Sequence, residues 1–176
     1  MILMNDFKAE PLELREAMLK AANRVLESGW YVLGIECKQF EEQWSTVCGV
    51  GHGIGVANGM DAIEIALLGL SIGGGDEVIT TPMTAFATIL AIIRSGATPV
   101  LADIDSETAL LSIESVRRSL TTNTKAVILV HLYGQVRQMD EWVNFCEENK
   151  IMLIEDCAQA HQATWHGKVA GCFGQA

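Results

Sequence analysis

The sequence of 176 residues has little of what marks several large classes of protein. It contains only three prolines and no linker, low-complexity tract or internal repeat, so one compact unit is expected. Its longest apolar runs are far shorter than the ~20 residues of a membrane-spanning helix, which predicts a soluble protein with no membrane partner. The net charge of −10 leaves no basic stripe that could neutralise phosphates, which argues against nucleic acid as a partner.

Cysteines are also few, and none forms a C-x-x-C pair. No charged and then apolar leader opens the chain at "MILMNDFKAE". Together these absences predict a reduced, cytoplasmic protein without a metal site. The five cysteines are Cys37, Cys48, Cys146, Cys157 and Cys172.

Hydrophobic residues, in contrast, make up 49% of the chain, which is enough to bury a full core. In the first 48 residues they recur at helical spacing and predict two amphipathic helices. Gly29 is expected to end the first helix in the left-handed conformation. The first helix carries Leu14, Met18, Ala21, Ala22 and Val25, and the second carries Phe40, Trp44 and Val47.

From about residue 49 onward, short apolar runs alternate with helical patterns. Strands are predicted in "HGIGVAN", "DEVITT", "TPVLADI", "KAVILVH" and "IMLIED". Helices are predicted in "MDAIEIALLGL", around Phe86 to Ile93, near 112–120 and around Met139 to Cys146. This alternation predicts an α/β fold, namely an α/β/α sandwich with a largely parallel sheet. Residues from about 1 to 48 would form the amino-terminal helices, and residues from about 49 to 176 the α/β core.

One predicted strand leads through Asn58-Gly59 directly into a helix, which would expose the backbone amides of Met60 and Asp61. Helix amino-termini bind anions, and phosphate is a common occupant, but an ordinary strand-to-helix turn explains the pattern equally well. The glycines at 49, 51, 53 and 55 do not satisfy G-x-G-x-x-G. A nicotinamide-binding domain is therefore not expected.

Two further strand ends carry residues with chemical potential. Phe86 follows "DEVITT" and is either an aromatic that stacks on a flat cofactor or a core residue at helical spacing with Ile89 and Ile93. Asp156 ends "IMLIED", and a carboxylate at the end of a buried strand needs a partner. That partner could be a backbone cap, an arginine, or a cationic ring nitrogen of a ligand.

Five segments occur in the order and spacing of one known family. They are "SGWYVLG", "ANGMDAIEIAL", "TTPMTAFATILAIIRSGATPVLADID", "VILVHLYGQ" and "LIEDCAQAHQA". From about residue 28 to its end the chain resembles the sugar aminotransferases of the DegT/DnrJ/EryC1/StrS family, which are fold-type I enzymes dependent on pyridoxal 5'-phosphate. The resemblance implies the aspartate aminotransferase-like large domain as the fold and pyridoxal phosphate as the cofactor.

The resemblance also implies roles for individual residues. Gly59, Met60 and Asp61 match the turn whose amides hold the cofactor phosphate, with Met60 in place of a hydroxyl residue. Asp156 matches the aspartate that pairs with the pyridine nitrogen, and Gln159 the residue near the ring hydroxyl. The family places an aromatic where this chain has Ala85, so Phe86 is the candidate for ring stacking. A structural role is expected for His161.

The catalytic lysine is missing from these motifs. None of the six lysines of the chain lies where the family has the lysine that forms the Schiff base, so that residue is expected beyond Ala176. The chain is then the amino-terminal part of the large domain, without the carboxyl-terminal small domain, and is expected to be inactive by itself.

For the whole protein, the resemblance implies transfer of an amino group from an amino acid, commonly glutamate, to a keto-sugar on a nucleoside diphosphate. It also implies a homodimer, with "SGWYVLG" as a candidate contact or, alternatively, internal core. Two other functions remain open at this point. One is a sugar dehydratase of the same family, in which histidine replaces the lysine, and the other is a non-catalytic regulatory relative.

Overall fold

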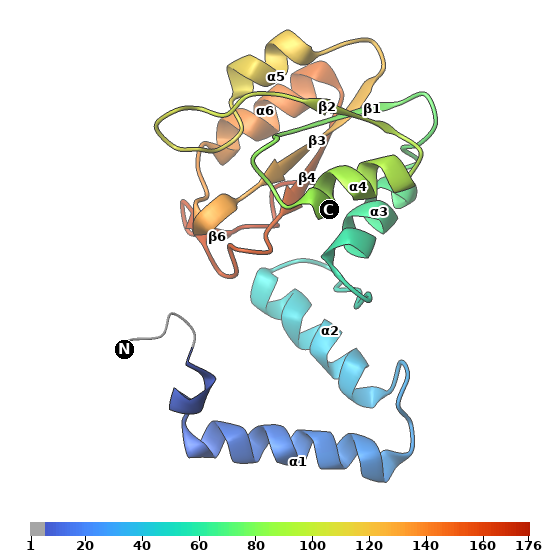
Figure 1. Cartoon of the computed structure of the whole chain (residues 1–176), viewed down its shortest axis with the longest axis vertical. Helices are drawn as coiled ribbons and strands as arrows, with labels where there is room; N and C mark the ends of the chain where they lie inside the picture. Colours follow the sequence, from blue (N-terminus) through green and yellow to red (C-terminus); the bar gives the residue numbers. More distant parts are fainter. Residues whose placement is uncertain (1–5) are drawn as a thin grey trace.

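The computed structural model describes residues 6–176, which form an α/β core preceded by helices that lie outside it (Figure 1). Before the core come η1 (Phe7–Ala9), α1 (Leu12–Ser28) and α2 (Ile35–Cys48). The core contains α3 (Gly59–Gly69), β1 (Glu77–Thr80), α4 (Phe86–Arg94), β2 (Thr98–Leu101), α5 (Ile113–Ser119), β3 (Thr124–Val130), η2 (Leu132–Gly134), α6 (Met139–Asn149), β4 (Met152–Asp156), β5 (Thr164–Trp165) and β6 (Lys168–Val169).

A four-stranded parallel sheet forms the centre of the core, in the order β2-β1-β3-β4. Helices α4, α5 and α6 connect its successive strands, so the expected α/β class with a parallel sheet is confirmed. The strand order reverses between β1 and β3. In sheets of this kind, ligands bind outside the carboxyl ends of the strands, at the point of reversal.

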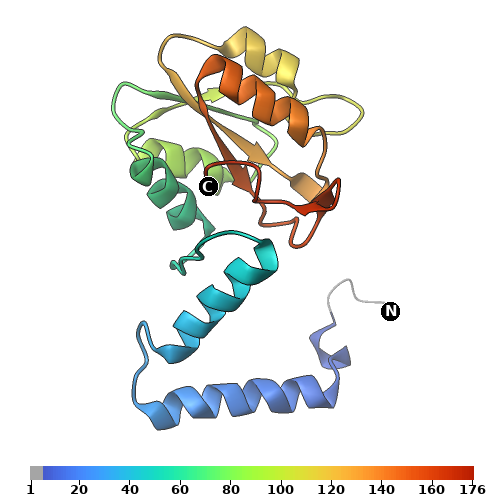
Figure 2. The same ribbon diagram turned by 180° about the vertical axis from the view of Figure 1, so that it is seen from behind.

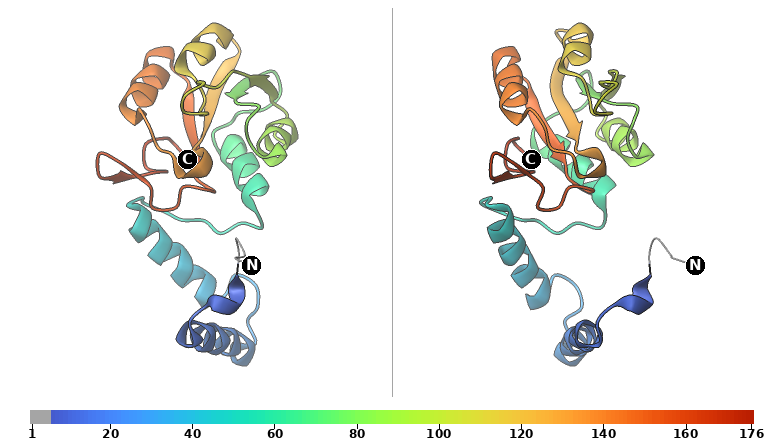
Figure 3. Two further views of the ribbon diagram at one scale, coloured as in Figure 1. Left: turned by 60° about the vertical axis from the view of Figure 1, so that its left-hand side comes forward. Right: turned by 90° about the vertical axis from the view of Figure 1, so that its left-hand side faces the viewer.

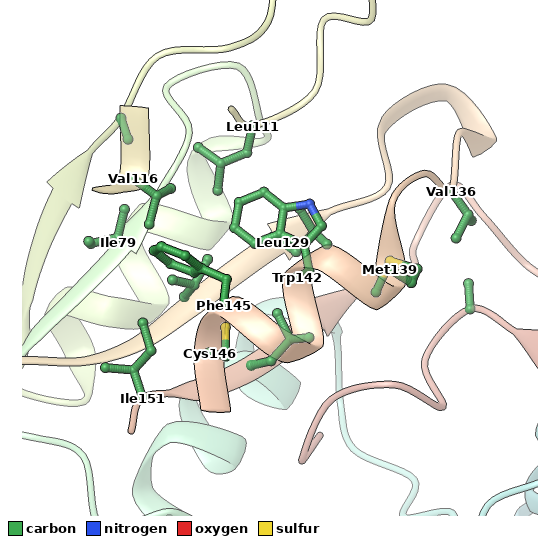
Figure 4. Packing of buried hydrophobic residues seen from close by; sticks show 14 of the residues in the cluster. Ile79, Leu111, Val116, Leu129, Val136, Met139, Trp142, Phe145, Cys146 and Ile151 are labelled. Atoms are coloured by element: carbon green, nitrogen blue, oxygen red, sulfur yellow. The ribbon is translucent and has the colours of Figure 1, made fainter. Parts of the chain in front are cut away.

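Helices cover both faces of this sheet, α3 and α4 on one and α5 and α6 on the other (Figure 3). Because side chains alternate along a strand, each strand supplies residues to both faces. Ile154 packs with Leu67 and Ile92 of α3 and α4, whereas Leu153 packs with the α6 side. Figure 4 shows this second cluster, in which α6 contributes Met139, Trp142, Phe145 and Cys146 at helical spacing.

Helices α1 and α2 contain no buried residue. Helix α1 ends at Gly29 with φ of 65°, as predicted, but most of its apolar residues are exposed, and Met18 is 56% exposed. Figures 1 and 2 show α2 between α1 and the core. The single compact unit expected from composition is therefore wrong for this part of the structure, because among residues 6–176 no apolar side chain of α1 is buried against another element.

Among the described residues, an aromatic pair and a hydrogen bond join the end of α2 to the core. The rings of Trp44 and His161 meet edge to face, with centroids 5.7 Å apart. In addition, the Cys172 thiol donates a hydrogen bond to the Cys48 carbonyl oxygen. The structural role expected for His161 agrees with its packing against Trp44.

The strand predicted in "HGIGVAN" is not formed. Residues 52–57 have no regular secondary structure and run beside α2, where the Gly55 N–H donates to the Glu41 carboxylate at 2.7 Å. A Cβ at Gly53 would lie 2.9 Å from the Glu41 carbonyl oxygen, so the close approach requires glycine. The prediction failed because glycine-rich alternation permits this packing as readily as a sheet.

In the region that the structure describes, no helix is both long and apolar enough to cross a membrane.

Candidate functional site

Strand β4 places its two carboxylates on opposite faces of the sheet. Leu153 contributes to the core under α5 and α6, and Ile154 to the core under α3 and α4. By the same alternation, Glu155 points to the α5 and α6 side, and Asp156 to the α3 and α4 side. Asp156 therefore shares a face with the two helices that begin at Gly59 and Phe86.

Asp156 has a backbone cap and remains accessible. Its Oδ1 accepts a hydrogen bond from the Ala158 N–H at 3.1 Å, and the residue is only partly buried. Within residues 6–176, no arginine or lysine forms an ion pair with it, and Oδ2 accepts no hydrogen bond. Of the partners considered from the sequence, the backbone cap is present, and one carboxylate oxygen is left for a ligand.

Helix α3 is followed by a short turn and then by β1, which runs in the opposite direction to the helix (Figure 1). The amino end of α3 therefore lies toward the carboxyl ends of the strands. The amide expected to be free at Asp61 is not free, because the Asn58 side chain caps it at 2.9 Å. In the first turn of α3, the amides that donate no hydrogen bond within the described chain are those of Gly59 and Met60. This turn therefore offers two N–H groups, one residue earlier than predicted.

The Asp61 carboxylate is engaged within the protein. It accepts from Asn58 Nδ2 at 2.9 Å and lies 3.5 Å from the Arg94 guanidinium, which also pairs with Glu64 at 2.8 Å. The one positive charge of Arg94 offsets part of the negative charge of Asp61 and Glu64 near the helix terminus. An anion could thus approach the amides of Gly59 and Met60 with less repulsion from this carboxylate.

Phe86 begins α4 directly after Ala85, the residue before the helix. Its side chain is 71% exposed, and Ile93 is 52% exposed. The interpretation of Phe86 as a core residue is therefore wrong. The ring is available at the carboxyl end of β1, but its exposure alone does not identify what it contacts.

Gln159 lies in the loop after β4 and is fixed by the neighbouring loop after β3. Its Oε1 accepts a hydrogen bond from the Tyr133 N–H at 2.8 Å. Tyr133 has φ of 56°, a conformation that costs energy for a residue with a side chain. With its oxygen occupied, Gln159 presents its amide group as a hydrogen-bond donor at the same end of the sheet as Asp156.

The predicted residues thus lie at one end of the sheet but in three separate segments. Among the described residues, no hydrogen bond or ion pair joins the turn at Gly59 to Ala85 and Phe86, or either segment to Asp156 and Gln159. A ligand that touched all three would therefore connect parts of the chain that are otherwise held only by the fold.

Sequence reasoning missed a buried polar cluster on the other face. The Glu155 side chain has no exposed surface and lies 2.9 Å from Nε2 of His131, which is also buried. Ligand atoms of His131, Glu155 and Cys157 lie within 4.8 Å of one another. The available signal was the pair "ED" at the end of an apolar run, because strand alternation must send its two carboxylates to different faces.

Burial by itself raises the pKa of Glu155, but four hydrogen bonds oppose it. They come from His131 and from the N–H groups of Gly171, Gly174 and Phe173, and together they hold the pKa below that of an ordinary glutamate. Glu155 is therefore ionised at neutral pH. Burial raises the pKa of Cys157 to about 12, so its thiol stays protonated and is a poor metal ligand.

The chain is similar in sequence to a family of known proteins. The sequence profile of the DegT/DnrJ/EryC1/StrS aminotransferase family matches residues 12–176. The chain is 42% identical over 176 residues to dTDP-3-amino-3,6-dideoxy-alpha-D-galactopyranose transaminase of Aneurinibacillus thermoaerophilus, covering 100% of this chain and 48% of that protein. It is 39% identical over 173 residues to the pleiotropic regulatory protein of Geobacillus stearothermophilus, covering 98% and 46%.

A solved structure shows the same fold. The crystal structure of DesV from S. venezuelae in complex with a ketimine intermediate superimposes with a TM-score of 0.91 at 40% identity, over 94% of this chain and 45% of that one. Two other similar structures are of proteins in their pyridoxamine phosphate form and their pyridoxal phosphate form. The chain spans about half the length of the relatives it matches. It belongs to the DegT/DnrJ/EryC1/StrS aminotransferase family.

Proposed function

We propose that residues 1–176 are the amino-terminal part of the cofactor-binding large domain of a pyridoxal-phosphate-dependent sugar aminotransferase. The observation that supports this most directly is Asp156, a partly buried carboxylate at the carboxyl end of β4 with Oδ2 unpaired within the described chain. Its position suits a cationic ring nitrogen better than a structural ion pair. The family assignment supports a pyridine as that ring.

The residues present fit this cofactor. Gly59 and Met60 would donate backbone N–H groups to the phosphate at the amino end of an eleven-residue helix. Asp156 would hold the proton on the ring nitrogen, and the side-chain amide of Gln159 would donate to the ring hydroxyl. Phe86 is the aromatic available beside the ring. When bound, the cofactor supplies an electron sink for a carbanion at the substrate carbon.

The lysine that such a reaction needs is proposed to lie outside these residues. Lys125 and Lys150 lie at the amino ends of β3 and β4, away from Asp156. Lys168 lies in the β5–β6 hairpin with its ammonium 4.5 Å from the centre of the Phe173 ring. Lys125 and Lys150 are thus at the opposite end of the sheet from Asp156, and the Lys168 ammonium packs on the Phe173 ring.

We infer that the whole protein transfers an amino group from an amino acid, glutamate being the first candidate, to a keto-sugar linked to a nucleoside diphosphate. The nucleotide-sugar substrate named for the relative from Aneurinibacillus thermoaerophilus supports this class. We further propose that it works as a homodimer in the cytoplasm. The exposed apolar residues of α1 support the homodimer. The cysteines, all free thiols, support a reducing compartment such as the cytoplasm.

The test is a half-reaction of the full-length protein loaded with pyridoxal phosphate. With L-glutamate and no sugar, an aminotransferase should release one 2-oxoglutarate per site while the cofactor loses its visible absorbance. D-glutamate is the matched control and should release none. Cofactor binding without this reaction would favour the dehydratase, and absence of cofactor binding would favour a regulatory protein.

A further inference from the structure

Residues 171–174 are attached to β4 through the buried side chain of Glu155. Its Oε1 accepts from the Phe173 N–H at 2.7 Å and the Gly174 N–H at 2.8 Å. Its Oε2 accepts from the Gly171 N–H at 2.9 Å and lies 2.9 Å from His131 Nε2. Each carboxylate oxygen therefore accepts two hydrogen bonds, and three of the four donors belong to residues 171–174.

Main-chain bonds continue this attachment toward Ala176. The Gln175 N–H donates to the Leu153 carbonyl at 2.8 Å, and the Glu155 N–H donates to the Ala176 carbonyl at 2.9 Å. A Cβ at Gly174 would overlap the Leu153 carbonyl oxygen, so the close approach requires glycine. The segment 171–176 lies against the outer edge of β4, the strand that carries Asp156.

This arrangement exceeds what a loop needs for stability alone. A loop of six residues could satisfy three N–H groups with water at the surface. Instead, a charged side chain is buried to hold them, which is costly unless every partner is in place. The cluster fixes the direction in which the chain leaves the sheet.

We propose that Glu155 is a positioning residue that holds residues 171–174 against β4 and so directs the following chain, with its lysine, toward the cofactor at Asp156. This rests on the proposed function for the existence of the lysine and the cofactor. Because Glu155 and Asp156 are adjacent in one strand, the same backbone fixes the cofactor partner and the anchor of the following chain. Glu155 itself touches neither substrate nor cofactor.

The test compares Glu155→Gln with Thr124→Val in the full-length protein. The glutamine would place an NH2 group against backbone N–H donors and break part of the anchor. Thr124, at the amino end of β3, is also buried, and its hydroxyl accepts from the Thr121 N–H at 3.0 Å. Its substitution removes a comparable buried acceptor at the opposite end of the sheet.

The first readout is hydrogen–deuterium exchange of the peptide 170–176 in cofactor-free protein. Exchange should be about tenfold faster or more in Glu155→Gln, as expected for loss of a hydrogen bond to a charged group, and unchanged in Thr124→Val. Unchanged exchange in Glu155→Gln would overturn the anchor. This readout does not depend on the proposed function.

The second readout is the glutamate half-reaction. For Glu155→Gln we expect kcat to fall about tenfold or more with KM for glutamate changed less than about twofold, since the binding groups stay in place. Thr124→Val should retain both values. Faster exchange with unchanged kcat would overturn the positioning role alone. A wild-type protein that never reacts with glutamate would overturn the proposed function, and with it the positioning role, but would leave the anchor at Glu155 standing.

Gly174→Ala provides an independent variant if Glu155→Gln does not fold. It displaces the same segment from its other side and leaves the Glu155 carboxylate intact. The same split between kcat and KM is expected. Wild-type kinetics in a folded Gly174→Ala protein whose peptide 170–176 exchanges faster would contradict the proposal.

Discussion

Glu155 and Asp156 are consecutive residues of β4, yet their carboxylates have different surroundings. Four hydrogen-bond donors enclose Glu155, whereas Asp156 has one backbone cap and an unpaired oxygen in the described chain. A side chain whose partners are all internal serves the fold, and one with a vacant acceptor is available to a ligand. The two residues can therefore be tested separately.

Asp156→Asn in the full-length protein should lower turnover about 100-fold or more, the equivalent of about two pKa units of lost stabilisation of a protonated ring. The amide is nearly isosteric, so the melting temperature should change by less than about 2 °C. Asp103→Asn is the control, an exposed carboxylate just after β2 at the far edge of the sheet. Unaltered turnover in Asp156→Asn would refute its assignment as the ring partner.

Glu155 should make the protein sensitive to acid. Its folded-state pKa is lowered, so its stabilisation is complete above the unfolded pKa of about 4.3 and is lost as pH falls through the lower folded value. Urea unfolding at pH 7 and pH 3 measures this. The free energy of unfolding should fall more steeply between these pH values in wild type than in Glu155→Gln, and equal losses would contradict the prediction.

At the scale of elements, α3 shows how one helix can face the core on one side and water on the other. Leu67 is fully buried against the sheet, and the next residue, Leu68, is 52% exposed. Leu67→Ala should lower the free energy of unfolding by about 2–5 kcal/mol, because it leaves a cavity. Leu68→Ala should cost less than about 1 kcal/mol in the same urea titration. Similar costs would mean that α3 does not pack as described.

Most elements of the core were predictable, because their apolar periods were long enough to distinguish helices from strands. Strands β1 to β4 and helices α3 to α6 form where the pattern placed them. The conformation of residues 52–57 was not predictable, because glycine has no side chain whose burial would indicate a strand. The edge of the sheet at which the candidate site lies was predictable from the positions of the strand ends. The capped amide of Asp61 and the cluster around Glu155 were not, because they depend on individual side-chain hydrogen bonds.

At the scale of the whole molecule, the amino-terminal region exposes an unusual amount of apolar surface. Trp30, Tyr31, Val32, Leu33 and Ile35 are each more than half exposed, as are Leu12, Met18, Leu19 and Leu26 of α1. Exposed apolar side chains gathered in one region of a chain are typical of sites of association. The "SGWYVLG" segment is not part of the core that the described residues form, and a contact with a second subunit is the role we propose for it.

The full-length protein should therefore sediment as a dimer, and Val32→Glu should weaken the dimer about tenfold or more by placing a charge in a desolvated contact. Asn144→Glu on α6 adds the same charge at an exposed position of the core and should leave association unchanged. Sedimentation velocity over a range of concentrations measures both. A wild-type protein that stays monomeric and fully active would contradict the dimer.

The alternation of β4 imposes a rule of parity on its length. Inserting one residue between Ile151 and Glu155 would turn the two carboxylates to each other's face, so that the shorter aspartate would meet the donors of residues 171–174 and the glutamate would face α3 and α4. Inserting two residues would restore both orientations. Variation in the length of this strand should thus be tolerated only in even steps, however well the added residues suit a buried sheet.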